Sequence, residues 1–293
     1  MTQAKGHFYV EQNKILSHGH PKGVKMSAKE ITNGIEAKVV VEKNAKIKEP
    51  LYFCFGMLGE ENEQLILPVI EVQDGAEVTI IAHCSFPNAK KAVHKMTALF
   101  KVGKKAKFRY EEHHYHGDKS GASVFPGLKL EVDEGGELVS VFNLSQGTVG
   151  RIEIELEAFL QKSAKAHIET KVFGKSEKDE VFIFDKVHLL GENSKSLIKM
   201  RAAAKNGGKV MMQGENYARA AGATGHVDCQ EIVVGEGSVA KAVPIVEVSN
   251  ENARVTHEAS VGKINQKELE TLMTRGLSEE EATELIIEAM MKG

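Results

Sequence analysis

The 293-residue chain has no tryptophan, only 6% aromatic residues and six prolines, whereas glycine is plentiful at 27 residues. A core without large rings must be filled by Val, Ile, Leu and Ala, which suits closely stacked strands. Hydrophobic residues make up 42% and charged residues 27% of the chain. These values are typical of a folded domain and exclude general disorder.

No excess of charge of one sign is present. Lys and Arg total 38 against 41 Asp and Glu, a net charge of −3. This balance lacks the basic footprint of nucleic-acid binding. No run approaches the roughly 18 apolar residues that a membrane span needs, and the start MTQAKGHFYVEQNK lacks the apolar core of a signal peptide. Three widely spaced cysteines without a CxxC pair indicate reduced thiols. We therefore expect a cytoplasmic protein with no membrane or nucleic-acid partner.

Short β-branched segments bounded by turn residues dominate the chain between residues 37 and 262. Examples are AKVVVE (37–42), EVTIIA (77–82), KFRYE (107–111), ELVSVF (137–142) and AHIETKV (166–172). No amphipathic helix of four turns interrupts them, so βαβ units are not expected. The pattern predicts a mainly β protein.

A weak repeat runs through this region, built of a turn residue, a small residue, a polar residue and an apolar one. It occurs at Ala76, Ala106, Gly136, Ala164 and Gly208, with spacings of 30, 30, 28 and 44 residues. A period near 30 indicates a solenoid in which each coil stacks on its neighbours. An antiparallel sandwich with evenly spaced hairpins fits the same pattern, and the spacing alone leaves both open.

The last thirty residues change character. Asn265 followed by Glu268 predicts a short capped helix, and the Ser278–Glu281 capping box predicts a second one. The expected apolar stripe of this second helix consists of Leu285, Ile286, Ala289 and Met290. Two helices in this position either cap the open end of a solenoid or, with Met290 and Met291 exposed, hold another protein.

Cys229, in GHVDCQEIVVG, and Glu258, in ARVTHEASVGKI, are the candidate metal ligands. A lone strand cysteine is usually a small core residue, and a glutamate is usually a solvated surface group. Their separation of 29 residues matches the repeat, which predicts that they lie on a common flank of adjacent coils. A thiolate and a carboxylate so placed suit iron, and a symmetric dimer would double them to four ligands. His257 is the reserve candidate, since a twist or bulge would exchange it with Glu258.

The run EEHHYHG contains His113, His114 and His116, of which the last two share a strand face. No glutamate follows them as a cupin site would require, so we favour a structural or pocket-lining role over a metal site. Cys54 and Cys84 follow or interrupt apolar runs and are expected to be core thiols rather than ligands. Common catalytic motifs (nucleophile elbow, P-loop, dinucleotide-binding glycines, HExxH) are absent from the sequence.

Several stretches resemble the SufB and SufD proteins of iron–sulfur cluster assembly. They are YEEHHYHG, KNGGKVMMQGENYARAAGATGHVDCQEIVVG and VEVSNENARVTHEASVGKINQKELETLMTRGLSEEEATELIIEAMM. The last carries a HEA strand, a helix ending in Arg-Gly and a Ser-Glu-Glu helix start. The resemblance extends from about Leu51 to the C-terminus, and the last ninety residues are the most similar.

This resemblance implies a right-handed parallel β-helix core over residues 49–263, after an N-terminal segment of residues 1–48. It also implies a C-terminal helical segment, residues 264–293, that docks a SufC-like ABC ATPase. The core is expected to form a homodimer that builds a transient iron–sulfur cluster for acceptor proteins. The family's cluster cysteine matches Cys229, its glutamate matches Glu258, and the adjacent histidine matches His257.

The resemblance further implies a scaffold rather than an enzyme, with ATP hydrolysis in the partner. The chain is short for SufB, and residues 158–160 (AFL) stand where longer SufB proteins carry a sulfur-receiving cysteine. This is typical of minimal two-component systems with one homodimeric scaffold. The alternatives are a β-solenoid that recruits other proteins and a polysaccharide-active β-helix enzyme.

Overall fold

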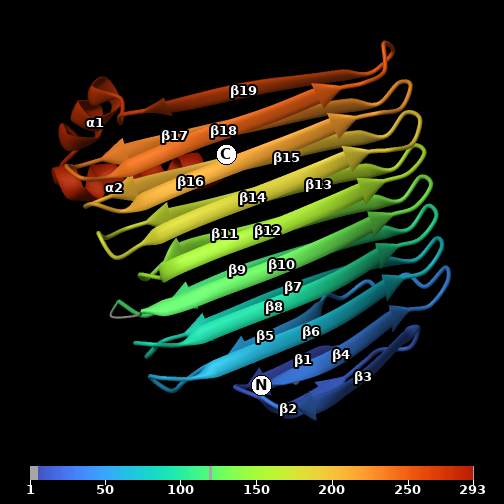
Figure 1. The fold of residues 1–293 in the computed structure, drawn as a ribbon. Helices are drawn as coiled ribbons and strands as arrows, with labels where there is room; N and C mark the ends of the chain where they lie inside the picture. The colour runs from blue at the N-terminus through green and yellow to red at the C-terminus, as the bar shows by residue number, and fades with distance from the viewer. Residues whose placement is uncertain (1–5, 119–120, 293) are drawn as a thin grey trace.

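The computed structural model describes residues 6–118 and 121–292, which form nineteen strands and two helices. From β4 onward, consecutive strands alternate between two facing sheets, and the coils stack from the N-terminal ones at the bottom to the C-terminal ones at the top of Figure 1. In the order in which they pair, the strands of the first sheet are β19 (Arg254–Gly262), β17 (Thr224–Val234), β15 (Lys195–Lys205), β13 (Lys165–Gly174), β11 (Glu137–Gln146), β9 (Lys107–His116), β7 (Glu77–Phe86), β5 (Leu51–Gly56), β1 (His7–Glu11) and β2 (Lys14–Gly19). Those of the second sheet are β18 (Val239–Val248), β16 (Lys209–Ala218), β14 (Glu180–Leu189), β12 (Gly150–Leu160), β10 (Ala122–Val132), β8 (Val93–Val102), β6 (Glu63–Val72), β4 (Gly34–Val41) and β3 (Val24–Ile31).

Strand pairing decides between the two architectures that the sequence leaves open. Each strand from β5 to β19 pairs in parallel with a strand two positions away in the chain, as β15 does with β13 and β17. A sandwich of hairpins would instead pair consecutive strands antiparallel. The chain is therefore a β-solenoid, as predicted. Antiparallel pairs within the described residues are the two N-terminal hairpins, β1–β2 and β3–β4.

A recurring corner explains the repeat seen in the sequence. Residues in the left-handed region stand at one corner of successive coils, which lets the chain turn sharply from the second sheet into the first. They are Asn44, Gly75, Lys105, Gly135, Ser163, Asn193 and Gly222. The amide of each donates to a carbonyl of the next coil, as from Gly75 to Lys104 (2.8 Å) and from Ser163 to Glu192 (2.8 Å). Ser194 and Ala223 continue the small-residue positions, whereas Gly208 lies in the turn between β15 and β16.

The core fills the space between the sheets, which we call the interior. Alternate residues of each strand face it, and the sequence supplies aliphatic side chains at most of these positions. Phe100 packs edge to face with Phe108 and Tyr110 within it, with ring centroids 5.4 and 4.9 Å apart. Strands β1 and β4, which precede residue 49, pair in parallel with β5 and β6 and so add to both sheets.

The two helices, α1 (Gln266–Met273) and α2 (Glu279–Lys292), lie beside the last coils (Figure 1). Both predicted caps are present: Asn265 accepts from the amides of Lys267 and Glu268, and Ser278 exchanges hydrogen bonds with Glu281. No described helix is long and apolar enough to cross a bilayer.

The apolar stripe expected on α2 is partly wrong, because the helix buries a different set of side chains. Ile287 and Met291 are buried against Phe173 and Ala203, on the outer face of the first sheet. Leu285 is 44% exposed. Met291 therefore braces the helix against the solenoid instead of standing exposed.

Candidate functional site

Cys229 lies near the C-terminal end of the solenoid, on the inner face of β17, and is 1% exposed. The strand alternates Val227 and Cys229 inward with Asp228 and Gln230 outward. Only β19 separates this strand from the end of its sheet. The thiol therefore sits inside the solenoid, within one strand of its edge.

The register between β17 and β19 does not bring Cys229 and Glu258 together. Cys229 pairs with Ala259, and Glu258 pairs with Asp228 on the outer face. Because paired residues in a parallel ladder point to the same side, the thiol and the Glu258 carboxylate point to opposite faces. The predicted common flank is wrong because this coil has a period of 30 residues rather than 29. His257 pairs with Val227 and so shares the face of Cys229.

Two acidic residues that sequence reasoning did not select face the interior near the thiol. Glu231 follows Cys229 by two residues on the same face and is 1% exposed, and neither of its carboxylate oxygens has a hydrogen-bond partner among the described residues. Asp185 projects from β14 in the opposite sheet and accepts a hydrogen bond from the Thr170 hydroxyl (2.8 Å). A signal existed for both: Cys-x-Glu spacing for Glu231, and an aspartate at an inward position of VFIFDKV for Asp185.

Burial dominates the electrostatics of this group. Burial, followed by the negative charge of Glu231, Asp228 and Asp185, raises the pKa of the Cys229 thiol to about 12. Burial also raises the pKa of Glu231 to about 7 and, against the Thr170 hydrogen bond, that of Asp185 to about 7. Without a bound metal ion, the Cys229 thiol is therefore protonated, and the neighbouring Glu231 and Asp185 carboxyl groups are easily protonated.

Such a group suits a metal cation. A cation provides the opposite charge that the interior lacks, so it favours loss of the protons from the thiol and the carboxyl groups. Thiolate and carboxylate are both established ligands of iron. The two unpartnered oxygens of Glu231 supply acceptors that no described side chain uses.

On the outer face, Arg201 fixes the strand that carries the thiol. Its guanidinium forms a bidentate ion pair with the Asp228 carboxylate, with N–O distances of 3.0 and 2.6 Å. It also donates hydrogen bonds to the backbone carbonyls of Met200 and Asp228. The Arg201 hydrogen bonds hold the pKa of Asp228 below its usual value. Because Asp228 precedes Cys229, this clamp sets the position of the thiol.

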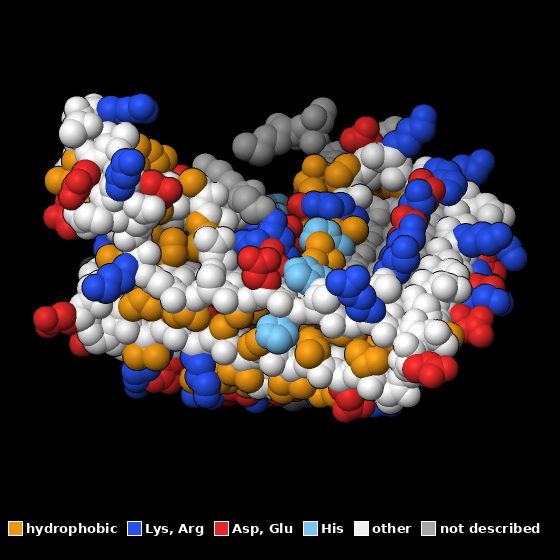
Figure 2. All heavy atoms as spheres, turned by 90° about the horizontal axis from the view of Figure 1, so that it is seen from above, with side chains coloured by type: hydrophobic (Ala, Val, Ile, Leu, Met, Phe, Trp, Pro, Cys, Tyr) orange, Lys and Arg blue, Asp and Glu red, His pale blue; other side chains and the backbone are white. Residues whose placement is uncertain are grey.

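The solenoid is open at this end, where β18 and β19 are the last strands of their sheets. Val246, Val248 and Val261 are 38%, 46% and 49% exposed. Their register partners Asn216, Ala218 and Glu231 are buried on inner faces, so the valines line the opening of the interior. Figure 2 views the molecule from this end, where hydrophobic side chains lie among histidine and charged groups.

A groove of about 520 Å³ adjoins the opening. It runs between the end of β19, the connection to α1 and the face of α2 that carries Ile286 and Met290, and Glu231 lies in its wall. Met290 adapts readily to a bound surface. The groove therefore joins the buried Glu231 to the helical segment.

The three histidines of the EEHHYHG run are divided between the faces of β9. His113 points outward, stacks on His83 at a centroid distance of 5.5 Å and lies 3.5 Å from Glu111. His114 and His116 are buried in the interior. Of the two other cysteines, Cys84 is buried as predicted, whereas Cys54 is only partly buried, on the opposite side of its strand from the core positions Phe53 and Phe55.

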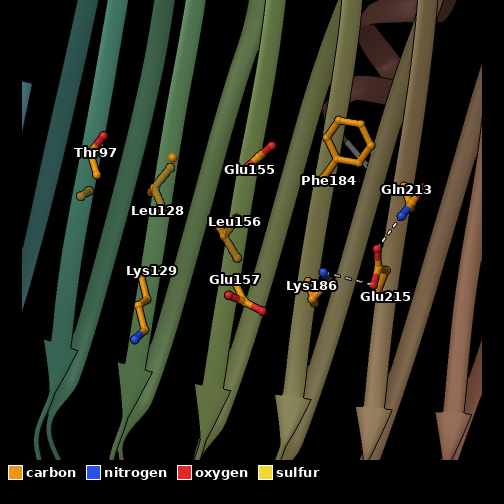
Figure 3. A pocket seen from close by; sticks show the side chains of 12 residues that line it. Thr97, Leu128, Lys129, Glu155, Leu156, Glu157, Phe184, Lys186, Gln213 and Glu215 are labelled. Atoms are coloured by element: carbon orange, nitrogen blue, oxygen red, sulfur yellow. Dashed lines mark hydrogen bonds and ion pairs between the residues drawn. The ribbon is translucent and has the colours of Figure 1, made fainter. Parts of the chain in front are cut away.

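A second groove, of about 430 Å³, lies on the outer face of the second sheet (Figure 3). Lys129, Glu157, Lys186 and Glu215 cross four neighbouring strands with alternating charge. Glu215 lies 3.7 Å from the Lys186 ammonium, and Glu157 lies 2.9 Å from His188 on the same sheet. These carboxylates are engaged in pairs that tie the strands together.

The chain matches a known family model and is similar to several proteins of that family. The model of the SUF-system FeS cluster assembly SufBD core domain matches residues 58–290. The chain is 39% identical over 282 residues to an iron-sulfur cluster assembly SufBD family protein of Methanocaldococcus jannaschii, covering 96% of this chain and 89% of that protein. It is 32% identical over 283 residues to a protein of the same name from Pyrococcus horikoshii, covering 96% and 85%. A Staphylococcus epidermidis protein of that name is 28% identical over 253 residues, covering 85% and 53%.

Proposed function

Because the chain belongs to the SufBD family of SUF-system iron–sulfur cluster assembly proteins, we propose that it is a homodimeric scaffold on which a nascent cluster is built at the open end of the solenoid. The observation that carries this proposal is the position of Cys229. It is a thiol one strand from an open end, with Glu231 and Asp185 as acidic neighbours. The cluster is cargo that the scaffold passes to acceptor proteins.

The open end favours a second copy of the chain as the partner. Two unpaired strand edges and three exposed valines expose apolar and backbone groups that a monomer would leave in water. A two-fold axis at this end would bring two copies of Cys229 toward each other. β18 carries Pro244, which lacks an amide donor, so β19 provides the more continuous edge for pairing.

Four ligands are needed for a cluster, and each chain supplies candidates from one small region. Cys229 is the anchoring thiolate. The family resemblance assigns Glu258 as its companion, while the register favours His257 and Glu231 because they share the thiol's face. A mixed set binds iron less tightly than four thiolates would, which allows transfer of the cluster.

Anaerobic reconstitution with Fe²⁺ and sulfide tests the scaffold role. The wild-type dimer should develop the charge-transfer absorption of a cluster, Cys229→Ala should abolish it, and Cys54→Ala should leave it intact. Retention of the absorption in Cys229→Ala would contradict the proposal. If dimers form and no cluster appears in any variant, the solenoid is a recruitment module.

The companion ligand can be identified with three further variants, His257→Ala, Glu231→Gln and Glu258→Ala. If the register in the free chain persists in the dimer, the first two lower the cluster yield more than the third does. The opposite order would support Glu258 and require β19 to shift by one residue on assembly.

The helical segment is the proposed docking site for an ABC-type ATPase, which would supply the ATP hydrolysis that this chain is not expected to perform. Leu285 and Met273, 44% and 40% exposed, remain available for contact once α2 is braced on the solenoid. A chain ending at Lys263 should keep its fold and cease to co-purify with the co-expressed ATPase. Unchanged co-purification would show that the ATPase binds elsewhere.

A further inference from the structure

A second polar cluster lies in the interior at a distance from Cys229, and nothing in the proposed function uses it. Cys84 on β7 pairs in register with His114 on β9, so both side chains point inward from neighbouring strands. Glu112 precedes His114 by two residues and shares its face. The three side chains are at most 4% exposed.

Their ligand atoms converge. The Cys84 Sγ, a Glu112 carboxylate oxygen and a ring nitrogen of His114 all lie within 4.8 Å of one another. His114 Nε2 is 2.7 Å and Cys84 Sγ is 3.8 Å from Glu112 Oε1. Ligands of a tetrahedral ion are about 3.4 to 3.8 Å apart when the metal–ligand distances are about 2.0 to 2.3 Å. Side-chain movements of less than about 1 Å would therefore produce that geometry.

Hydrogen bonding within the described residues leaves this cluster incomplete. His94 Nε2, His114 Nδ1 and both ring nitrogens of His116 are buried without a partner there. The rings of His94 and His116 lie 6.3 and 5.7 Å from that of His114. Each such buried nitrogen costs about 1–3 kcal/mol. Three histidines gathered beside a thiol and a carboxylate indicate a site that is completed by something other than protein.

We propose that Cys84, Glu112 and His114 bind one divalent transition-metal ion of the Zn²⁺ or Fe²⁺ type inside the solenoid. Sulfur, nitrogen and a single carboxylate exclude Ca²⁺ and Mg²⁺, which prefer oxygen ligands. Three protein ligands leave a fourth position for water or for His94 or His116.

Charge balance supports a divalent ion. On binding, the Cys84 thiol loses its proton to solvent, which leaves one thiolate, one carboxylate and a neutral imidazole around a charge of two. The site then has zero net charge, which an apolar interior tolerates far better than an isolated ion. No electron transfer is involved.

Neighbouring groups orient two members of the cluster. The Tyr110 hydroxyl donates to Glu112 Oε2 (2.9 Å), which leaves Oε1 directed at Cys84 and His114. His94 is held through its Nδ1 by Gln64 Oε1 (2.9 Å), so its unpartnered Nε2 is the free end of the ring. Such outer hydrogen bonds are typical of protein metal sites.

The site is independent of Cys229. Leu144, Val172 and Ala202 occupy the same interior row between His114 and Glu231. Five strand spacings of about 4.8 Å separate β7 from β17, or roughly 24 Å. An ion at Cys84 therefore either stabilises the fold or is stored there, and it is not part of a cluster at the open end.

Metal analysis of the full chain tests the proposal. Protein purified anaerobically, and protein refolded with Zn²⁺, Fe²⁺ or Co²⁺ and then desalted, should retain one ion per chain. Co²⁺ should show thiolate-to-metal charge transfer, and binding should release about one proton per ion. Zn²⁺ should displace Fe²⁺ and Co²⁺.

Matched variants locate the ion. Cys84→Ser and His114→Gln should lower the affinity at least tenfold and remove the thiolate absorption, whereas Cys229→Ser and Cys54→Ser should keep both. Absence of any retained ion in refolded wild-type protein would overturn the proposal. So would equal retention by folded Cys84→Ser. If Cys84→Ser does not fold, a Co²⁺-loaded wild-type spectrum without sulfur coordination decides against it.

Discussion

The two ends of the solenoid differ in how stacking stops. At the N-terminal end, β2 and β3 turn back as antiparallel hairpins on β1 and β4, and ion pairs such as Lys25–Glu42 and Lys29–Glu36 border them. At the C-terminal end, β18 and β19 continue the parallel stack and then stop. A stack of coils can grow wherever an edge is unprotected. The first end is terminated by the chain itself, and the second is suited to termination by a partner.

Exposed apolar side chains follow the same division. Among described residues β2 carries Leu16, 66% exposed, whereas β18 and β19 together carry four large exposed valines: Val239, Val246, Val248 and Val261. The polar clusters differ too. Glu112, on the N-terminal side, accepts from three side chains, whereas Glu231 at the open end accepts from none of the described residues.

The largest loss of stability should come from truncating a side chain in the middle of the interior. Phe108→Ala removes a fully buried ring and should cost about 3–5 kcal/mol of unfolding free energy. Val248→Ala at the open end should cost less than about 1 kcal/mol in the monomer, because that side chain is already 46% exposed. Urea denaturation monitored by circular dichroism measures both. Equal losses would show that the open end is packed as tightly as the middle.

Asp185 should make stability depend on pH. Its pKa is raised from 3.8 to about 7, so the folded chain keeps a proton that the unfolded chain has lost. Protonated Asp185 therefore contributes up to about 4 kcal/mol to the free energy of unfolding below about pH 4. This contribution is lost as the pH rises from about 4 to about 7 and does not change further above about pH 7. Asp185→Asn should remove this contribution, leave the smaller one of Glu231, whose pKa is also raised to about 7, and be more stable than wild type at pH 8.

The matched change at the other cluster is Glu112→Gln, in metal-free protein. It should destabilise the fold by about 1–3 kcal/mol, because it disturbs an acceptor of three hydrogen bonds. Unfolding curves from pH 4 to 8 test both variants. If both variants changed stability in the same direction, the contrast between a carboxylate with three donors and one with none would have no energetic consequence.

Charges placed on the exposed valines should break the proposed dimer. The double variant Val248→Lys, Val261→Lys should raise the dimer dissociation constant about 100-fold, since two valines contribute about 3 kcal/mol when buried. Leu16→Lys at the N-terminal end should leave it unchanged. Sedimentation velocity measures the dissociation. If Leu16→Lys produced a monomer, the interface would lie at the N-terminal end, contrary to the proposal.

The smallest effect should be local. Ile287→Ala should loosen α2 from Phe173 and Ala203 by about 2 kcal/mol, whereas Leu285→Ala should leave its docking unchanged. Hydrogen exchange of the α2 amides reports this without unfolding the solenoid. Greater exchange in Leu285→Ala would favour the stripe predicted from sequence.

Sequence reasoning succeeded where the relevant information is local or periodic. The spacing of Ala76, Ala106, Gly136 and Ala164 reflects one corner of each coil, and the caps at Asn265 and Ser278 need only a few residues. It failed where a shift of one residue matters. Coils vary in length by one or two residues, so 29 residues could not decide which of His257 and Glu258 faces Cys229.

Other features depend on contacts that no local pattern contains. The buried face of α2 is selected by Phe173, more than a hundred residues earlier. The thiol beside Glu112 and His114 comes from the preceding coil, so a search along EEHHYHG could not find it. The register of β7 on β9 was needed.

The left-handed corner residues recur once in each coil, so each coil is a repeat unit that can be exchanged as a whole. Since each corner bonds only to the next, a whole coil could be removed or duplicated while every remaining strand kept its inner and outer faces. Removing the segment from Gly135 to Lys162 would shorten the spacing between Cys84 and Cys229 by one rung, about 4.8 Å, without touching either cluster. The distance between the two clusters is therefore set by the number of coils between them, and this number can change without altering the residues of either cluster.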